Sequence, residues 1–276
     1  PPKVSQIFVA GTEITYHCKD CRACLECKKS DRFESISIQE EIEQTVIEKS
    51  VTVDTINGQT TAKLPFMFNP VHRLRPNMHM ALKVYQSQVR KLTKIPTDMN
   101  NVLVSENKLQ QLGFVEYVDN LSYEEQSMIH NSDVKYFIPW RAVWNENSLS
   151  TPCRLVFDAS QSVKDSNSLN DLLAKGTNNM NKLIEILIRW SVHRVAFHTD
   201  IQKMYNAIRL AKCHWNYQLY LWNDSFDIDN PKSKVIKTLI YGVKSSGNQA
   251  ECGLRKTAKL LEPGHERACR VIHKDI

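Results

Sequence analysis

Helical and strand-forming segments interleave along this chain without strict alternation, and this order constrains the fold more than any other feature. Apolar residues spaced three or four apart predict helices, and short β-branched or aromatic runs predict strands. Helices are predicted over 37–48, 78–95, 105–112, 122–130, 178–192 and 248–261, and strands over 51–53, 61–68, 134–144, 153–159, 194–199, 216–222 and 234–241. Asn57-Gly58 predicts a hairpin between the first two strands. We therefore expect an α+β fold.

The composition is that of a globular protein. Apolar residues make up 42% and charged residues 24% of the 276 residues, which excludes collagen-like, low-complexity and largely disordered chains. No window approaches about 18 uncharged apolar residues, so no membrane partner is expected. The chain begins Pro1-Pro2 and stops at Ile276, and we interpret it as a piece of a longer polypeptide.

The basic charge is confined to the second half of the chain. Residues 1–150 hold 17 basic and 18 acidic side chains, a net charge of −1. Residues 151–276 hold 19 and 12, a net charge of +7. A localised excess of this kind suits a polyanionic partner such as nucleic acid, although scattered surface charge explains it equally well.

Four cysteines stand together near the start, at Cys18, Cys21, Cys24 and Cys27. A zinc site is one interpretation, but zinc knuckles usually come in two pairs separated by a dozen or more residues. An iron–sulfur cluster is a second, although its usual run has a longer last gap and a following proline. Free or redox-active thiols are the third. The other four cysteines are scattered singly, and we interpret them as reduced, mostly structural thiols.

Asp200 stands at the end of an apolar run and leads into a tight turn, with Tyr205 five residues further on. A carboxylate in that position can bind Mg²⁺ together with substrate phosphates. Taken alone, an aspartate at a strand end is more often a turn or cap residue. Tyr205 strengthens the binding interpretation because an aromatic ring at this spacing can form the floor of the same pocket.

Two more segments carry groups that suit phosphate. Arg154 lies on a predicted strand upstream of Asp200, where its planar guanidinium can pair with phosphate oxygens. A salt bridge between Arg154 and Asp158 is the alternative. Gly242 to Gly247 form a small-residue turn before a helix, and a helix N-terminus favours an anion.

The order of these segments resembles a reverse transcriptase. More narrowly, residues from about Tyr16 to Ala258 resemble the polyproteins of BEL/Pao long-terminal-repeat retrotransposons. The match is carried by CRACLECK, YFIPWRAVW, STPCRLVFDAS, SLNDLLAKG, FHTDIQKMYNAI and LIYGVKSSGNQAECGLRKTA. The resemblance implies the fingers and part of the palm of an RNA-directed DNA polymerase, with a mixed, mainly antiparallel sheet and packed helices.

The resemblance also assigns roles to single residues. Asp200 would be the first catalytic aspartate, binding Mg²⁺ or Mn²⁺ with help from the Ile201 carbonyl. Tyr205 would be the aromatic side chain that stacks under the sugar and excludes a 2′-hydroxyl. Arg154 would contact the incoming triphosphate, with two ions assisting transfer to the primer 3′-oxygen.

The turn before the last predicted helix would complete the pocket. By resemblance, Gly242, Ser246 and Gly247 would support the nucleotide and the template. The family often has a fingers lysine about seven residues before the arginine, and here Arg141 is the nearest cation.

The family also needs a second pair of aspartates in a Tyr-x-Asp-Asp hairpin, and the 276 residues do not contain it. The segment from His273 is expected to lead as a strand into that hairpin, so the fold would be truncated before it. With Asp200 alone, two divalent ions cannot be held against their repulsion. We therefore expect the chain as given to be catalytically incomplete.

The resemblance divides the chain into three parts. Residues 1–34 form a polar segment with the cysteine cluster and its candidate zinc, 35–133 a connecting region with the start of the fingers, and 134–276 the incomplete fingers and palm. The implied partners are RNA template, DNA primer and deoxynucleoside triphosphate, with protease, ribonuclease H and integrase elsewhere in the polyprotein. The expected location is inside the cell: the cytoplasm, which includes virus-like particles, or the nucleus. The alternative is a non-catalytic nucleic-acid-binding or metal-binding module.

Overall fold

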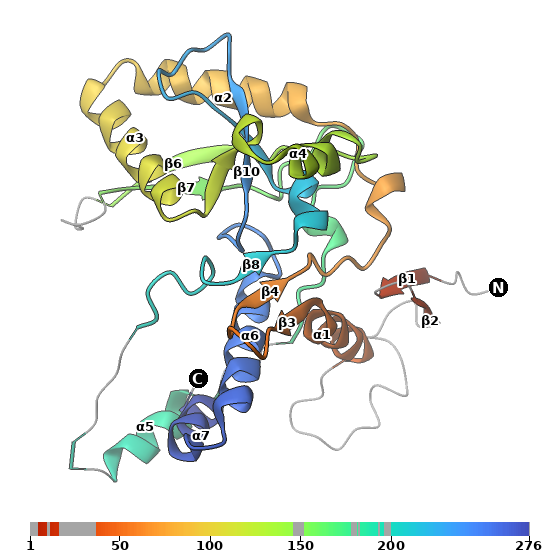
Figure 1. The fold of residues 1–276 in the computed structure, drawn as a ribbon, viewed down its shortest axis with the longest axis vertical. Helices are drawn as coiled ribbons and strands as arrows, with labels where there is room; N and C mark the ends of the chain where they lie inside the picture. Colours follow the sequence, from red (N-terminus) through yellow and green to blue (C-terminus); the bar gives the residue numbers. More distant parts are fainter. Residues whose placement is uncertain are drawn as a thin grey trace.

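The computed structural model describes residues 5–9, 12–16, 37–145, 152–177, 181, 183–192, 194–195 and 200–275 (Figure 1). The helices are α1 Ile38–Ser50, α2 Met78–Leu92, α3 Pro96–Gln111, α4 Tyr123–His130, α5 Leu183–Ser191, α6 Ser246–Leu261 and α7 Glu266–Asp275. The strands are β1 Ser5–Val9, β2 Thr12–Tyr16, β3 Val51–Val53, β4 Thr60–Ala62, β5 Val115–Tyr117, β6 Trp140–Trp144, β7 Cys153–Phe157, β8 Arg209–Leu210, β9 Leu219–Trp222 and β10 Lys232–Ile236. Helices and small sheets are mixed, which is an α+β architecture.

Two predicted helices begin at serines that form complete capping boxes. The Ser37 side chain accepts from the Glu40 amide, and the Glu40 carboxylate accepts in return from Ser37. Ser122 and Glu125 repeat this arrangement at the start of α4. Each box satisfies amides that the first helical turn leaves without partners, so local sequence alone defines these starts.

One other helix prediction and one strand prediction need correction. The helix predicted from Ser105 begins instead at Pro96, a residue well suited to the first helical position. The strand expected from His273 is wrong, because Glu266–Asp275 form α7. Within 178–192, the described part of the helix is Leu183–Ser191, and its apolar side chains are exposed, Leu183 by 68% and Ile188 by 59%.

The sheets join segments that are far apart in the sequence. The hairpin predicted around Asn57-Gly58 is confirmed: β3 and β4 pair antiparallel. β8 adds to β4 in parallel, and β10 pairs antiparallel with both β5 and β9. The strand predicted over 216–222 is shortened, because the 3-10 helix η5 occupies Lys212–Tyr217. Strands from residues 35–133 and from residues 134–276, which the resemblance assigns to different parts, therefore share sheets. The strand predicted over 194–199 falls largely outside the described residues.

The β6–β7 hairpin covers the main core. Trp140 is 2% exposed, packs 5.1 Å from Trp222 between ring centroids, and donates from its indole N–H to the Leu221 carbonyl. The helices α2 and α3 lie along this hairpin, at the opposite end of the molecule from α5 and α7 (Figure 1). The hairpin is thus held rigidly from one side.

A fully buried ion pair crosses this core. The Lys234 ammonium lies 2.7 Å from a Glu106 carboxylate oxygen and 2.6 Å from the Gln110 amide oxygen. Tyr220 donates its hydroxyl to the same Glu106 oxygen, and the Tyr117 ring faces the ammonium at 4.1 Å. Because a buried charge is costly unless paired, this network couples α3 to the strands β5, β9 and β10.

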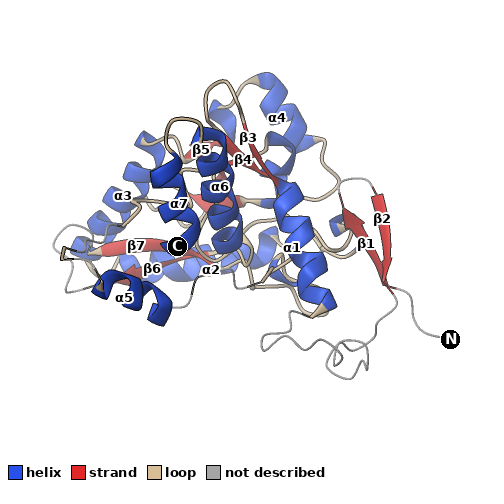
Figure 2. Cartoon of the chain, turned by 90° about the horizontal axis from the view of Figure 1, so that it is seen from below, coloured by secondary structure: helices blue, strands red, loops and turns tan. Residues whose placement is uncertain are grey.

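A second core lies between α1, the β3–β4 hairpin and α6, and α7 packs beside α6 (Figure 2). The Gln249 side chain on α6 is completely buried and donates to the Ser50 hydroxyl and the Lys63 carbonyl. These bonds hold the first turns of α6 against the hairpin. In the part of the chain that the structure describes, no helix has both the length and the apolar composition needed to cross a bilayer.

Candidate functional site

Two arginines lie on the same face of the β6–β7 hairpin. The register pairs Arg141 with Val156 and Val143 with Arg154. Because opposed residues share a face and alternate residues repeat it, both arginines stand on one side, as diagonal neighbours. The opposite side carries Trp140, Cys153 and Phe157, which are all buried. Both arginine side chains are exposed, so the hairpin presents two guanidinium groups away from its core.

The salt bridge that could have occupied Arg154 is formed by another residue. The Asp158 carboxylate lies 3.5 Å from the guanidinium of Arg141. Asp158 follows directly after β7, where Arg141 reaches it across the hairpin. The predicted alternative, a pair between Arg154 and Asp158, is therefore wrong, and Arg141 is only partly available to a ligand.

The turn at Gly242 packs directly against the end of β7. Gly242 has φ 99°, and a Cβ placed there would stand 1.8 Å from the Phe157 carbonyl oxygen. Only glycine accepts both the left-handed conformation and this contact. The turn after Ile240 is thereby fixed three residues from Arg154 along β7.

Asn170 joins three loops at this place. Its side-chain amide donates to the Gly242 carbonyl at 2.9 Å and to the Ser160 hydroxyl at 2.8 Å. Its side-chain oxygen accepts from the Lys244 amide at 2.8 Å. Asn170 is not among the predicted site residues, although it lies inside the SLNDLLAKG segment, where polar residues stand among apolar ones.

Tyr205 lies against the same turn. Its ring centroid is 4.4 Å from that of Tyr241, and its hydroxyl is 3.3 Å from the position of a Cβ on Gly247. The next residue, Asn206, donates to the Thr238 hydroxyl and the Leu239 carbonyl, which anchors the turn that carries Tyr205. Burial, followed by the nearby Tyr241, raises the pKa of Tyr205, so its hydroxyl remains protonated near neutral pH.

The first turn of α6 completes this cluster. Ser246 is 1% exposed, and its hydroxyl has no hydrogen-bond partner among the described residues. The preceding Ser245 donates to the Gln249 side chain instead of capping the helix. The start of α6 is therefore held by the buried side chains of Ser245 and Gln249, whereas Gly247 is exposed beside Tyr205.

Asp200 and Ile201 stand apart from these contacts. Both are exposed, and they precede the turn that carries Tyr205. An exposed carboxylate fits Mg²⁺ when nucleotide phosphates supply further oxygens. In the part of the chain that the structure describes, no three or more histidine, cysteine, aspartate or glutamate side chains gather as a group that could hold a metal ion.

The structure thus joins some predicted site residues and leaves others unlinked. Tyr205, Gly242, Ser246 and Gly247 meet around one turn, and Arg154 lies on the strand that this turn touches. The candidate zinc ligands Cys18, Cys21, Cys24 and Cys27 lie outside the described residues.

The scattered cysteines are free thiols, as predicted. Cys153, Cys252 and Cys269 are buried, and burial, followed by Asp98, raises the pKa of Cys153 to about 11. Cys213 is exposed, so a structural role does not extend to it.

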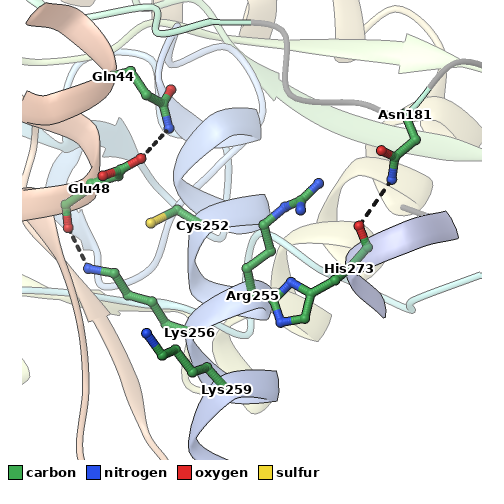
Figure 3. Close-up of a pocket in the computed structure, with 8 residues that line it drawn as sticks. All are labelled: Gln44, Glu48, Asn181, Cys252, Arg255, Lys256, Lys259 and His273. Atoms are coloured by element: carbon green, nitrogen blue, oxygen red, sulfur yellow. Dashed lines mark hydrogen bonds between the residues drawn. The ribbon is translucent and has the colours of Figure 1, made fainter. Parts of the chain in front are cut away.

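A separate pocket of about 450 Å³ lies between α1, α6 and α7 (Figure 3). Two of its three cations are engaged within the protein: Arg255 pairs with Glu251, and Lys256 donates to the Glu48 and Val51 carbonyls, while Lys259 also lines the pocket. Lys256 thereby caps the end of α1. The Arg255 pair lies within α6, whereas the Lys256 bonds hold α6 against the end of α1.

The chain was compared with protein families and with curated proteins. No family model matches it, and no curated protein matches it at a significant level.

Proposed function

We propose that this chain contributes the fingers and part of the palm of an RNA-directed DNA polymerase of the BEL/Pao retrotransposon type, and that it binds a deoxynucleoside triphosphate without polymerising it. The observation that carries the proposal is the meeting of Tyr205, the Gly242 turn and the end of β7, whose strand bears Arg154. These segments are distant in sequence, and the nucleotide pocket implied by the family resemblance requires all three.

Each part of this cluster suits a part of a nucleotide. The guanidinium of Arg154 is a planar donor that can bind two phosphate oxygens, with Arg141 beside it on the same face. The start of α6 adds the positive end of a helix dipole, which favours phosphate. The Tyr205 ring, set against Tyr241, gives a flat surface for the sugar.

Asp200 would hold Mg²⁺ or Mn²⁺ through the bound triphosphate. The ion would supply charge neutralisation for the phosphates, and Asp200 supplies one carboxylate to it. A second ion would need further carboxylates, and the sequence contains no adjacent aspartate pair. Binding without incorporation is therefore the expected activity.

The test is nucleotide binding, measured by fluorescence with a labelled deoxynucleoside triphosphate in the presence of Mg²⁺ or Mn²⁺. We expect saturable binding that Arg154→Ala weakens about tenfold or more, because a charged hydrogen bond contributes about 1.5–3 kcal/mol. Lys83→Ala removes an exposed charge from α2, outside the cluster, and serves as the matched control.

Two outcomes would overturn the proposal. One is the absence of saturable binding in the unaltered chain, and the other is equal weakening by Arg154→Ala and Lys83→Ala, which would indicate nonspecific attraction. Primer extension tests the second half of the proposal. Incorporation above that of an Asp200→Asn variant would show that the chain polymerises after all.

A further inference from the structure

A second pocket lies away from this cluster, where the end of α1, the β3–β4 hairpin and η5 meet. Its volume is about 330 Å³, at the small end of the range for ligand sites. It shares no residue with the candidate nucleotide site. Its floor and its rim differ sharply in chemistry.

The rim carries two lysines and no acid. Lys49 from the last turn of α1 and Lys63 from the chain after β4 both line the pocket, and both are exposed. Among its lining residues, all of which the structure describes, there is no carboxylate. Thr52 and Thr61 also line the pocket as an opposed pair on the hairpin, and the Thr52 hydroxyl donates to the Thr61 carbonyl. The rim is therefore positive and rich in hydrogen-bonding groups.

His214 adds a neutral donor to this rim. Its Nδ1 accepts from the Leu64 amide at 2.8 Å, so the ring proton lies on Nε2. Among the described residues, Nε2 has no hydrogen-bond partner. Burial, followed by the charge of Lys63, lowers the pKa of His214 to about 4, which keeps the ring neutral near pH 7.

The floor of the pocket is apolar. Val46, Leu64, Pro65 and Phe66 line it, and the Phe66 ring is held edge-on against His214 at 5.6 Å between centroids. An apolar floor with a few convergent polar groups is the usual composition of a small-molecule site.

We propose that this pocket binds a phosphate monoester whose other end presents an apolar face, such as the base of a nucleoside monophosphate. A phosphate monoester has a charge between −1 and −2 at pH 7, which two ammonium groups can balance, whereas a carboxylate would leave one of them unpaired. The His214 Nε2–H is a further donor to a phosphate oxygen, and the floor receives the apolar group. This binding goes beyond the proposed nucleotide site, because neither depends on the other.

The test follows the ring resonance of His214 by NMR, identified by its loss in His214→Asn. Adenosine monophosphate is the probe, with inorganic phosphate and adenosine as its two parts. We expect a saturable shift with adenosine monophosphate, a weaker effect of phosphate and none with adenosine. Lys49→Ala and Lys63→Ala should each weaken binding about tenfold, since each removes a charged contact.

Lys83→Ala and Arg154→Ala serve as controls, and both should leave the His214 shift unchanged. The proposal is overturned if adenosine monophosphate at about 10 mM, a concentration that would detect even weak binding, does not shift the His214 resonance. It is also overturned if the two rim variants bind like the controls, or if adenosine binds as well as its phosphate. Equal binding of inorganic phosphate would refute the role of the apolar floor.

Discussion

The Tyr205 hydroxyl lies 3.3 Å from the point where a Cβ of Gly247 would stand. This distance is shorter than an ordinary van der Waals contact, so any larger residue at position 247 must move the tyrosine. Gly247 thus sets the position of the Tyr205 ring, which we propose contacts the sugar of the nucleotide.

Gly247→Ala should therefore weaken nucleotide binding several-fold without unfolding the protein. Gly247 lies in the first turn of α6, where alanine is the better helix former by up to about 1 kcal/mol. Thermal melting and nucleotide titration measure the two effects separately. Adding Tyr205→Phe removes the crowded hydroxyl and should restore binding; if it does not, the contact does not position the ring.

Gly242→Ala should destabilise the fold by about 3 kcal/mol, because it combines a strained backbone with a clash. The new Cβ would stand 1.8 Å from the Phe157 carbonyl oxygen. Gly264→Ala is the matched control: Gly264 has φ 91°, with nothing within 4 Å of its Cβ position. Equal loss of stability in both variants, measured by urea denaturation, would show that backbone strain alone matters.

Asn170→Asp should cost about 1 kcal/mol and weaken nucleotide binding in parallel. The carboxylate still accepts from Lys244 but cannot donate to the Gly242 carbonyl or the Ser160 hydroxyl. Asn100→Asp, on the exposed side of α3, is the control for added charge. Unchanged binding in a destabilised Asn170→Asp variant would mean that the loop junction serves stability only.

His214→Asn should flatten the dependence of stability on pH. The unfolded chain takes up a proton below about pH 6.5, whereas folded His214, with a pKa of about 4, does not. Stability therefore falls as the pH drops through this window, by up to about 1.4 kcal/mol per pH unit. Asparagine can still accept from the Leu64 amide, so urea midpoints measured across the window isolate the titration. Parallel curves for the two proteins would contradict this assignment.

Removing one partner of the Glu106–Lys234 pair should cost about 3–5 kcal/mol, because the other charge stays buried. The double variant Glu106→Leu with Lys234→Met should cost less than the two single variants together. The exposed Lys232→Met on the same strand is the control. Additive losses in chemical denaturation would show that the pair is not coupled.

Local signals explain which elements could be predicted from the sequence. Ser37 and Ser122 mark helix starts through capping boxes that involve only neighbouring residues. The β3–β4 hairpin is likewise local. The start of α3 was misplaced because Ser105 resembles a cap but lies inside a helix that already begins at Pro96.

Contacts between distant segments could not be predicted in this way. The two-residue strand β8 has no signal of its own, since it forms by pairing with β4 and by bridging to Thr238, both far away in the sequence. At the candidate site, single residues such as Tyr205 and Gly242 were identified from spacing and resemblance. Asn170, which holds the turn in place, was missed because its role depends on three loops that meet only in the folded chain.

The parallel pairing of β4 with β8 also bears on synthesis. Thr61 and Ala62 leave the ribosome long before their partners Arg209 and Leu210 exist. Until then the free edge of β4 is open to wrong pairing, and such nonlocal contacts fold slowly. Nascent chains that end before Leu210 should therefore depend on chaperones more than those that extend past it.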